Sequence, residues 1–469
     1  MPDVNAPFVP PRPVVAGHDD RRRVAVVGAG LCGLTAAYRL QRRGWVVDVF
    51  ESEDRAGGRV QTVREQGYAV DTGATALAAS YHAYTTLVAE LGLEIKPAAP
   101  CIGIVRDGSV HLLRLDRIVR SGLSTRLLST GSKLRLARLA FDVGRAKLRG
   151  QLDFADMRKA APLDNESSRD YAQRALNTEI DAYLCEPIVR TMLIANTDKV
   201  SRVELFSGVA NIFTTQILAL AGGQGTITER LADEVGVALN TPVVSISETA
   251  DQVDVEFREP NGRMVRAAYD AAIVTCPLPI ASEICPGQRE QLGPLAQALG
   301  YTQCITVGIG TTRAPDCPAF LVQLPSREDA EIALLFLDHN KAADRAPTGH
   351  GLISACWETD AATAMFGATD EAIVGRTLET VFRVFPELAG TVDFVEVTRW
   401  TRALPKTSIG SYKQIGEFMA GVDRSSRVQF AADYMSAAGQ NTAVEFGTRA
   451  ANSVHAIKPS QTVRRSAAV

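Results

Sequence analysis

The stretch that decides the fold is VAVVGAGLCG, residues 24–33. Its first four residues are apolar and rich in valine, which predicts a central parallel strand buried on both faces. Gly28, Gly30 and Gly33 follow with the spacing of a dinucleotide-binding turn, and a helix is expected through Leu40. Gly28 permits the tight turn, Gly30 removes a side chain where backbone approaches a pyrophosphate, and Gly33 lets the helix pack closely.

An acidic residue ends the second predicted strand, residues 45–50. Glu51 lies 23 residues after Gly28, where a carboxylate can accept hydrogen bonds from both ribose hydroxyls and would repel a 2′-phosphate. Leu31 and Cys32 begin the predicted helix, whose free N–H groups and positive dipole end would meet the phosphates. The segment therefore predicts a bound dinucleotide. The alternative is a βαβ unit that binds no nucleotide.

Two further small-residue loops follow. Gly57, Gly58 and Arg59 place a flexible loop and a fixed positive charge beside the same pyrophosphate, because an arginine fork suits phosphate oxygens. The alternative is a solvated turn with a surface arginine. Farther on, residues 73–75 follow a predicted strand and would let the backbone lie against a flat ring. A helix is expected from about residue 76 to residue 91.

Three stretches resemble the flavin amine oxidase and protoporphyrinogen oxidase superfamily: VAVVGAGLCGLTAAYRL (24–40), FESEDRAGGRV (50–60) and YAVDTGAT (68–75). By this resemblance Glu51 holds the adenosine ribose and Arg59 contacts the phosphates, whereas Gly73, Ala74 and Thr75 lie near the isoalloxazine. The resemblance implies an α/β fold: a Rossmann-type FAD-binding domain with an inserted α+β substrate domain and a helical cap.

The resemblance continues to about residue 457. The family residue matching Val243 brackets the adenine through its backbone, Asp433 matches the acid after the last strand, and Val444 falls near the flavin ring edge. No cysteine or histidine lies between residues 431 and 444 to bond the flavin, which indicates non-covalent FAD.

The predicted domain organisation is discontinuous. The expected parts are a flexible arm (1–22), an FAD-binding domain (23–95, 222–285 and 425–457), a helical cap (96–221), a substrate domain (286–424) and a tail (458–469). A substrate cavity is expected where the flavin meets the inserted parts, because ligand sites favour domain boundaries.

Composition excludes several function classes. The net charge of −3 gives no electrostatic case for nucleic-acid binding. Eight scattered cysteines without a CxxC pair argue against a metal site and suit reduced thiols in the cytoplasm.

Residues 112–151 hold ten lysines or arginines and two acids. We expect a solvated helical face there; the alternative is peripheral contact with an anionic membrane.

The inserted segments indicate the branch of the superfamily. The order of residues 164–172, 183–190 and 198–201 and the stretch TRWTRALP (398–405) resemble porphyrinogen oxidases. Amine oxidases usually carry a lysine that holds a water near flavin N5, and residues 302–308 contain none. Trp400 and Tyr412 are candidates for the wall of the substrate cavity, with buried core side chains as the alternative.

The expected function is oxidation of a small organic substrate by hydride transfer to flavin N5, as in protoporphyrinogen or coproporphyrinogen oxidases. Dioxygen or another acceptor would then take the electrons. Two alternatives remain open: a flavin amine oxidase acting on CH–NH groups, and a non-catalytic flavin-binding carrier. No sequence feature identifies a catalytic base.

Overall fold

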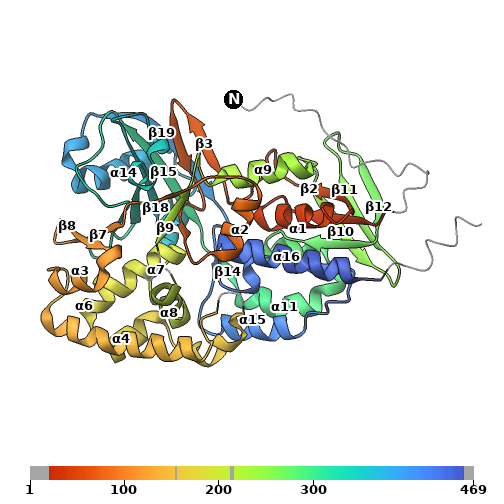
Figure 1. The fold of residues 1–469 in the computed structure, drawn as a ribbon, viewed down its shortest axis with the longest axis horizontal. Coiled ribbons are helices and arrows are strands. Elements are labelled where there is room, and N and C mark those ends of the chain that lie inside the picture. The colour runs from red at the N-terminus through yellow and green to blue at the C-terminus, as the bar shows by residue number, and fades with distance from the viewer. Residues whose placement is uncertain (1–20, 154–155, 212–215, 459–469) are drawn as a thin grey trace, which may run out of the picture. The chain divides into compact units, whose positions relative to one another are not determined.

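The computed structural model of the 469-residue chain describes residues 21–153, 156–211 and 216–458, which form two compact units (Figure 1). The first unit comprises Met1–Val60, Ile227–Gln297 and Phe418–Val469, and the second comprises Gln61–Thr226 and Ala298–Glu417. The expected arm and tail lie almost wholly outside the described residues. The predicted FAD-binding segment 23–95 is divided between the two units after Val60. The predicted domain boundaries stay a prediction.

A four-stranded parallel sheet forms the centre of the first unit, in the order β2-β1-β13-β21. Its strands are β1 (Arg23–Val27), β2 (Val46–Phe50), β13 (Ala271–Val274) and β21 (Val428–Phe430). Val24 and Val26 are fully buried, and Val26 pairs with Val49 on one side and Ile273 on the other. The prediction of a central parallel strand at residues 24–27 is confirmed.

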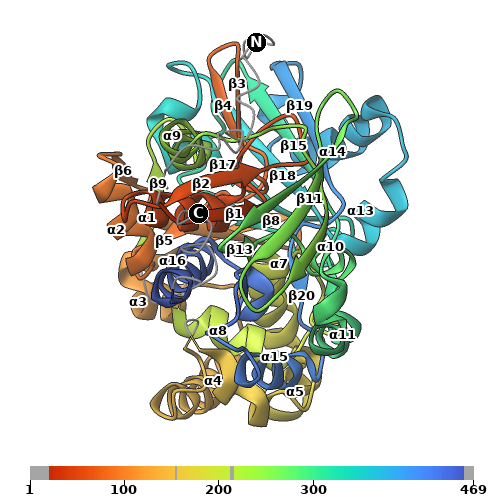
Figure 2. The ribbon, with the colours of Figure 1, turned by 90° about the vertical axis from the view of Figure 1, so that its right-hand side faces the viewer.

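Two helices of the first unit pack closely against each other. They are α1 (Leu31–Gln41) and α16 (Gln440–Ala456), which lie side by side in Figures 1 and 2. A Cβ added to Gly447 would lie 2.4 Å from the carbonyl oxygen of Cys32, so only glycine allows this approach. The chain segment that ends the unit is thereby fixed beside the helix that begins it.

The rest of the first unit surrounds this centre. The antiparallel sheet β10-β11-β12 consists of Val243–Glu248, Val253–Arg258 and Met264–Tyr269. Phe257 from this sheet contacts the ring of Phe50 at 4.7 Å between centroids. The remaining helices here are α9 (Gly225–Val235), α10 (Leu278–Ile284) and α11 (Arg289–Ala298), the first and last of which extend across a unit boundary.

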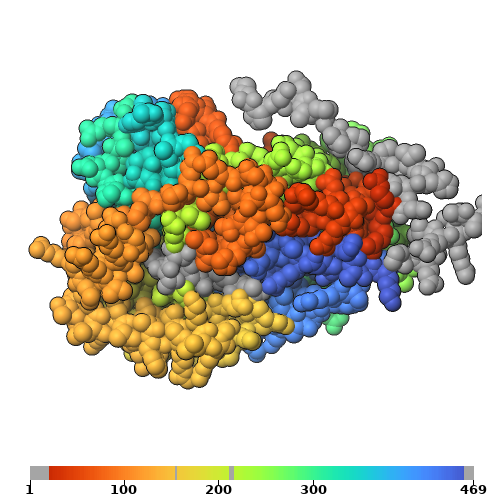
Figure 3. Space-filling model, viewed as in Figure 1, coloured from red at the N-terminus to blue at the C-terminus, as the bar shows by residue number. Residues whose placement is uncertain are grey.

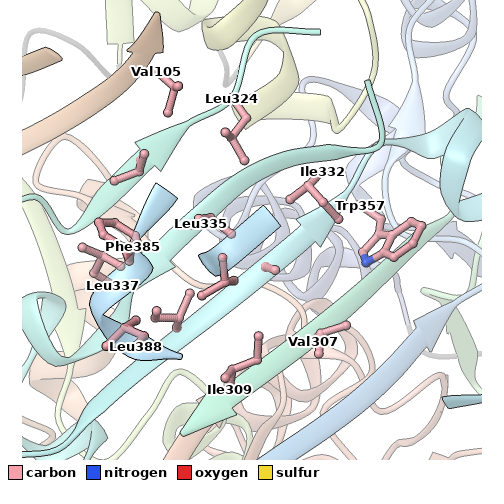
Figure 4. Packing of buried hydrophobic residues seen from close by; sticks show 14 of the residues in the cluster. Val105, Val307, Ile309, Leu324, Ile332, Leu335, Leu337, Trp357, Phe385 and Leu388 are labelled. Atoms are coloured by element: carbon pink, nitrogen blue, oxygen red, sulfur yellow. The ribbon is translucent and has the colours of Figure 1, made fainter. Parts of the chain in front are cut away.

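A seven-stranded sheet forms the core of the second unit, in the order β19-β15-β18-β17-β16-β7-β8. Its strands are β7 (Cys101–Arg106), β8 (Ser109–Arg114), β15 (Cys304–Thr311), β16 (Leu321–Gln323), β17 (Ile332–Leu337), β18 (Gly351–Trp357) and β19 (Val392–Trp400). Figure 4 shows how Val307, Leu335 and Trp357 from three of these strands pack in one hydrophobic cluster. The predicted helical cap 96–221 therefore begins with strands and becomes helical only from Ile118.

The helical part of the second unit contributes the light orange and yellow part of the surface in Figure 3. Its elements are α3 (Ile118–Ser124), α4 (Thr130–Leu148), η2 (Met157–Leu163), α5 (Ser168–Ala175), α6 (Thr178–Ile180), η3 (Asp181–Cys185), α7 (Glu186–Leu193) and α8 (Arg202–Asn211). Leu139 and Val143 of α4 are buried in a cluster with Tyr171. Leu134 and Leu148 of α4 are exposed, by 75% and 92%, so the basic segment is packed on one face only.

The expected helix at 76–91 begins later than predicted. Leu77–Ala78 forms strand β5, which pairs with β9 (Ile217–Leu220), and the helix α2 runs only over His82–Glu90. The cause is a pairing with a segment about 140 residues away, which local sequence does not reveal. None of the helices in the described part of the chain is long and apolar enough to cross a membrane.

Shorter elements complete the second unit. They are β3 (Thr62–Glu65), β4 (Tyr68–Asp71), β6 (Ile95–Pro97), α12 (Asp338–Lys341), α13 (Thr359–Met365), α14 (Asp370–Val384), the pair β14 (Gly300–Tyr301) and β20 (Pro405–Lys406), and α15 (Ser411–Ala420), which crosses the boundary.

Candidate functional site

The glycine-rich turn of the first unit has the geometry that a phosphate cradle requires. Gly28 has φ +99°, and a Cβ on Gly33 would lie 2.0 Å from the Gly28 carbonyl oxygen, so both positions require glycine. A Cβ on Gly30 would meet no protein atom within 4 Å. The N-terminus of α1, which starts at Leu31, has no side-chain cap and opens at this free space.

Glu51 is fixed at the end of β2. One carboxylate oxygen accepts the N–H of Ala29 at 2.8 Å, and the other accepts the N–H of Glu53 and the hydroxyl of Ser52, both at 3.1 Å. The side chain is 9% exposed. These contacts hold a carboxylate beside the glycine turn with its orientation set by the backbone.

The second glycine loop lies against the first. The N–H of Gly57 donates to the carbonyl of Ala29 at 2.8 Å, and a Cβ on Gly58 would lie 3.3 Å from the Gly30 Cα. Both loop glycines have positive φ, which favours glycine there. Two glycine segments separated in the chain by α1 and β2 thus lie directly against each other.

Arg59 and Asp433 meet beside these segments. The Arg59 Nη1 atom lies 2.8 Å from Asp433 Oδ2, although the residues come from opposite ends of the first unit. The other carboxylate oxygen of Asp433 is buried and accepts no hydrogen bond from the described residues. A buried oxygen without a donor would be satisfied by a hydroxyl group of a bound ligand.

Cys32, Val243 and Val444 complete the predicted set in this unit. The Cys32 thiol donates to the carbonyl of Ala431 at 3.1 Å, and burial raises its pKa far above the usual range, so the thiol stays neutral. Val444 is buried in α16, and Val243 begins β10. The carbonyl of Glu51 accepts the N–H of Thr241 at 2.7 Å, which places the start of β10 near that acid.

The residues of the first unit fit the adenosine and pyrophosphate parts of FAD. The observations that support the fit are the free space at Gly30, the uncapped helix, the oriented carboxylate of Glu51 and the unpartnered oxygen of Asp433. The unit contains all of these predicted residues: Gly28, Gly30, Leu31, Cys32, Gly33, Glu51, Gly57, Gly58, Arg59, Val243, Asp433 and Val444. Their individual contacts to FAD stay predictions.

The predicted ring-facing residues, Gly73, Ala74 and Thr75, lie in the second unit directly after β4. Gly73 and Ala74 are partly exposed, whereas Thr75 is buried and its hydroxyl has no partner among the described residues. Trp400, at the end of β19, donates its indole N–H to the carbonyl of Thr72 at 2.7 Å. Trp400 is therefore bound to the start of the predicted flavin-facing segment.

A buried ion-pair network holds the same segment from the other side. Asp71 accepts the hydroxyl of Thr62 at 2.7 Å and lies 3.0 Å from Lys341 Nζ and 3.4 Å from Arg345. Lys341 also lies 2.6 Å from Asp338. Burial works to raise the pKa of Asp71, but the two cations, together with the hydrogen bonds from Thr62 and the Gln224 N–H, outweigh it and lower the pKa. Sequence reasoning missed this network, since nothing local marks a lysine 270 residues beyond its partner.

Tyr412 lies elsewhere in the second unit and is fully buried. Its hydroxyl donates to Glu204, and its backbone N–H donates to Asp164 Oδ2 at 2.7 Å. These contacts are those of a core tyrosine, the alternative raised from the sequence. A role at the cavity wall stays a prediction.

The sequence matches the family of flavin containing amine oxidoreductases over residues 31–455. The chain belongs to this family. Its fold is that of an FAD-binding α/β protein with a substrate domain, and FAD is its cofactor. It is an FAD-dependent oxidase, which takes a small-molecule substrate and an electron acceptor, so the carrier alternative loses its support.

Curated relatives of this flavin oxidoreductase include porphyrinogen oxidases and an amine oxidase. The mitochondrial protoporphyrinogen oxidase of Nicotiana tabacum is 33% identical over 199 residues, which cover 42% of this chain but only 37% of that protein. The coproporphyrinogen III oxidase of Bacillus subtilis (strain 168) is 22% identical over 447 residues, which cover 85% of this chain and 90% of that protein. The flavin-containing amine oxidase B of Sus scrofa is 31% identical over 50% of this chain and 46% of that protein.

Two solved amine oxidase structures share the fold. Putrescine oxidase, in a structure with putrescine bound, matches with a TM-score of 0.74 and 20% identity over 93% of this chain and 99% of that one. Cyclohexylamine oxidase from Brevibacterium oxydans IH-35A matches with a TM-score of 0.74 and 20% identity over 92% and 98% of the two chains.

Proposed function

We propose that this flavoenzyme oxidises a porphyrinogen-type substrate by hydride transfer to flavin N5, with dioxygen as the electron acceptor. The observation that carries the proposal is the similarity to coproporphyrinogen III oxidase, which extends over 85% of this chain and 90% of that protein. The match to amine oxidase B covers about half of each chain. Bound FAD would accept the hydride from a substrate C–H bond, and loss of a proton from the neighbouring atom would leave a C=C or C=N bond in the product.

The residues of the first unit would bind the nucleotide half of the cofactor. The Glu51 carboxylate is oriented to accept the ribose hydroxyls, because two backbone N–H groups already fix its position. Arg59 would contribute positive charge to the pyrophosphate while Asp433 holds its guanidinium. The uncapped N-terminus of α1 adds backbone donors for the same phosphates.

The residues of the second unit would position the segment that faces the flavin ring. Trp400 holds the carbonyl of Thr72, and the buried cations at Lys341 and Arg345 hold Asp71 one residue earlier. Both contacts restrict the backbone that leads into residues 73–75. A rigid segment favours a single orientation of ring and substrate, which hydride transfer requires.

Amine oxidation is the second candidate, because amine oxidase B is 31% identical over 253 residues. Two features of this chain disfavour it. Strand β15, CITVGIGT, contains no lysine. Lys341 is fully buried between the carboxylates of Asp71 and Asp338, so its ammonium is already engaged.

Anaerobic reduction of the purified holoenzyme tests the proposal. Coproporphyrinogen III and protoporphyrinogen IX are mixed separately with the enzyme while the visible flavin band is recorded, with benzylamine and putrescine in parallel. Bleaching by a porphyrinogen but by neither amine supports the proposal. Bleaching by an amine alone, with the flavin still reducible by dithionite, overturns it in favour of amine oxidation.

A further inference from the structure

A cationic pocket lies in the helical part of the second unit, between α4, η2, α5 and α8. Its volume is about 280 Å³. Five arginines line it: Arg138, Arg145, Arg149, Arg174 and Arg202. Asp142 is the only acid among the described residues that line it. None of these residues belongs to the set expected to bind FAD.

The acids nearby are already engaged by three of the arginines. Asp142 Oδ2 accepts from Arg138 at 2.7 Å and from the hydroxyl of Tyr171 at 3.0 Å. Glu166 accepts from both Arg174 and Arg202. Five guanidinium groups therefore face two carboxylates, which leaves the pocket with an excess of positive charge.

Arg145 and Arg149 supply this excess. Within the described part of the chain, neither guanidinium forms an ion pair or a hydrogen bond. They lie four residues apart, at the last turn and the C-cap of α4, so both reach the same side of the helix end. One explanation is structural, because positive side chains at a helix C-terminus stabilise the helix dipole.

Gln151 is not explained by the helix dipole. This residue lines the pocket, is only 8% exposed, and its carboxamide has no hydrogen-bond partner among the described residues. Its backbone N–H closes the end of α4 by donating to Ala146 at 3.0 Å. Because Gln151 lines the pocket, its side-chain amide is not sealed off from it, and a ligand oxygen there would accept its N–H in place of solvent.

We propose that this pocket binds a phosphate monoester, held by Arg145, Arg149 and the carboxamide of Gln151. The planar guanidinium fork matches pairs of phosphate oxygens, and two unpaired arginines match a dianion. The phosphate comes from a free phosphate ester or from a lipid headgroup. The exposed side chains of Phe141 and Leu148 on α4 would favour the lipid. The proposal does not depend on the identity of the oxidised substrate.

Titration of the full-length, FAD-loaded enzyme with glycerol 3-phosphate, followed by calorimetry, tests the site. The double variant R145Q/R149Q is compared with R120Q/R126Q, which removes the same charge from exposed arginines outside the pocket. We expect the dissociation constant to rise by about tenfold or more in R145Q/R149Q and to stay within about twofold in the control. Equal weakening in both variants, or no saturable binding to the wild type, overturns the proposal.

A second variant separates ligand binding from helix stabilisation. Q151L keeps every charge, and we expect it to weaken phosphate binding about threefold or more through the loss of one hydrogen bond. If the arginines only stabilise α4, Q151L binds like the wild type, and R145Q/R149Q lowers Tm equally with and without the ester. That pair of results would overturn the proposal.

Cosedimentation with vesicles identifies the source of the phosphate. Vesicles of phosphatidylcholine alone are compared with vesicles that also contain phosphatidic acid. Binding to the second kind that R145Q/R149Q loses and the control keeps assigns the pocket to a lipid headgroup. Saturable binding of glycerol 3-phosphate without vesicle binding assigns it to a free ester. Both results support the phosphate site.

Discussion

Glu51 carries the most direct prediction at the scale of single residues. Its carboxylate is held by the N–H groups of Ala29 and Glu53 and is expected to bind the ribose of FAD. Glu51→Gln removes the charge from these hydrogen bonds, so we expect the FAD dissociation constant to rise about tenfold or more. The dissociation constant is measured from the fluorescence of released FAD. Glu53→Gln, an exposed neighbour, is the control, and unchanged affinity in Glu51→Gln would contradict the assigned role.

Lys341 illustrates the requirements of a buried charge. Lys341→Met leaves Asp71 and Asp338 with one cation fewer in a fully buried site, and such changes destabilise a fold by about 3–5 kcal/mol. Urea unfolding monitored by circular dichroism gives the free energy of unfolding. Lys96→Met breaks a partly exposed pair with Asp344 and should cost about 1 kcal/mol or less. Equal losses in the two variants would contradict the role of the network.

At the scale of elements, the start of α4 depends on one carboxylate. Glu179 accepts hydrogen bonds from the Ser129 N–H and hydroxyl, from Ser132 and from Arg106. Burial works to raise the pKa of Glu179, but these donors outweigh it and lower the pKa to about 2. Because the folded pKa is depressed, the stability that Glu179 contributes is present above its usual pKa, near 4.5, and is lost as pH falls towards 2.

Thermal unfolding as a function of pH tests this dependence. We expect Glu179→Gln to have a lower Tm than the wild type at pH 6, and the two curves to converge as the pH falls from about 4.5 to about 2. Glu283→Gln, a change at an exposed site on α10, should follow the wild type throughout. A constant gap between wild type and Glu179→Gln across the acid range would refute the anchoring role.

The elements also show where sequence reasoning succeeds. The βαβ unit from β1 to β2 was predictable because every signal is local: an apolar run, three glycines and a terminal acid. The helix expected from residue 76 was wrong at its start, since β5 pairs with β9 far along the chain. The strands β7 and β8 were also missed: they pair with each other as a hairpin, and β7 is joined to the rest of the sheet only by β16, which begins at Leu321.

In the candidate site, too, the features set by local sequence were predictable and those set by tertiary packing were not. The glycines and Glu51 follow from backbone requirements written into a short motif, and the structure places them together in the first unit. The contact between Arg59 and Asp433, and that between Asp71 and Lys341, depend on tertiary packing across more than 250 residues. No local pattern encodes such pairs.

For the molecule as a whole, cofactor binding should contribute to stability. The residues expected to bind FAD in the first unit come from its three chain segments, so unfolding must separate them. Added FAD at about 1,000 times its dissociation constant should stabilise the apoprotein by about 4 kcal/mol. FMN lacks the adenosine half and should stabilise it less. Urea unfolding in the presence of each ligand measures the two stabilisation free energies. Equal stabilisation by FMN would count against adenosine binding at Glu51.

The sheet order of the first unit has a consequence for biosynthesis. Strand β1 pairs with β2 and β13, but the sheet is finished only by β21, which ends at Phe430. At about 5–20 residues per second, a ribosome needs roughly 20–80 seconds to extend the chain from β1 to that strand. Once β13 is complete at Val274, its edge stays an unpaired template for other strands until β21 is made, roughly 8–30 seconds later at the same rate. Nascent chains should therefore depend on chaperones until the last strand emerges, more than a protein whose sheet closes in sequence order.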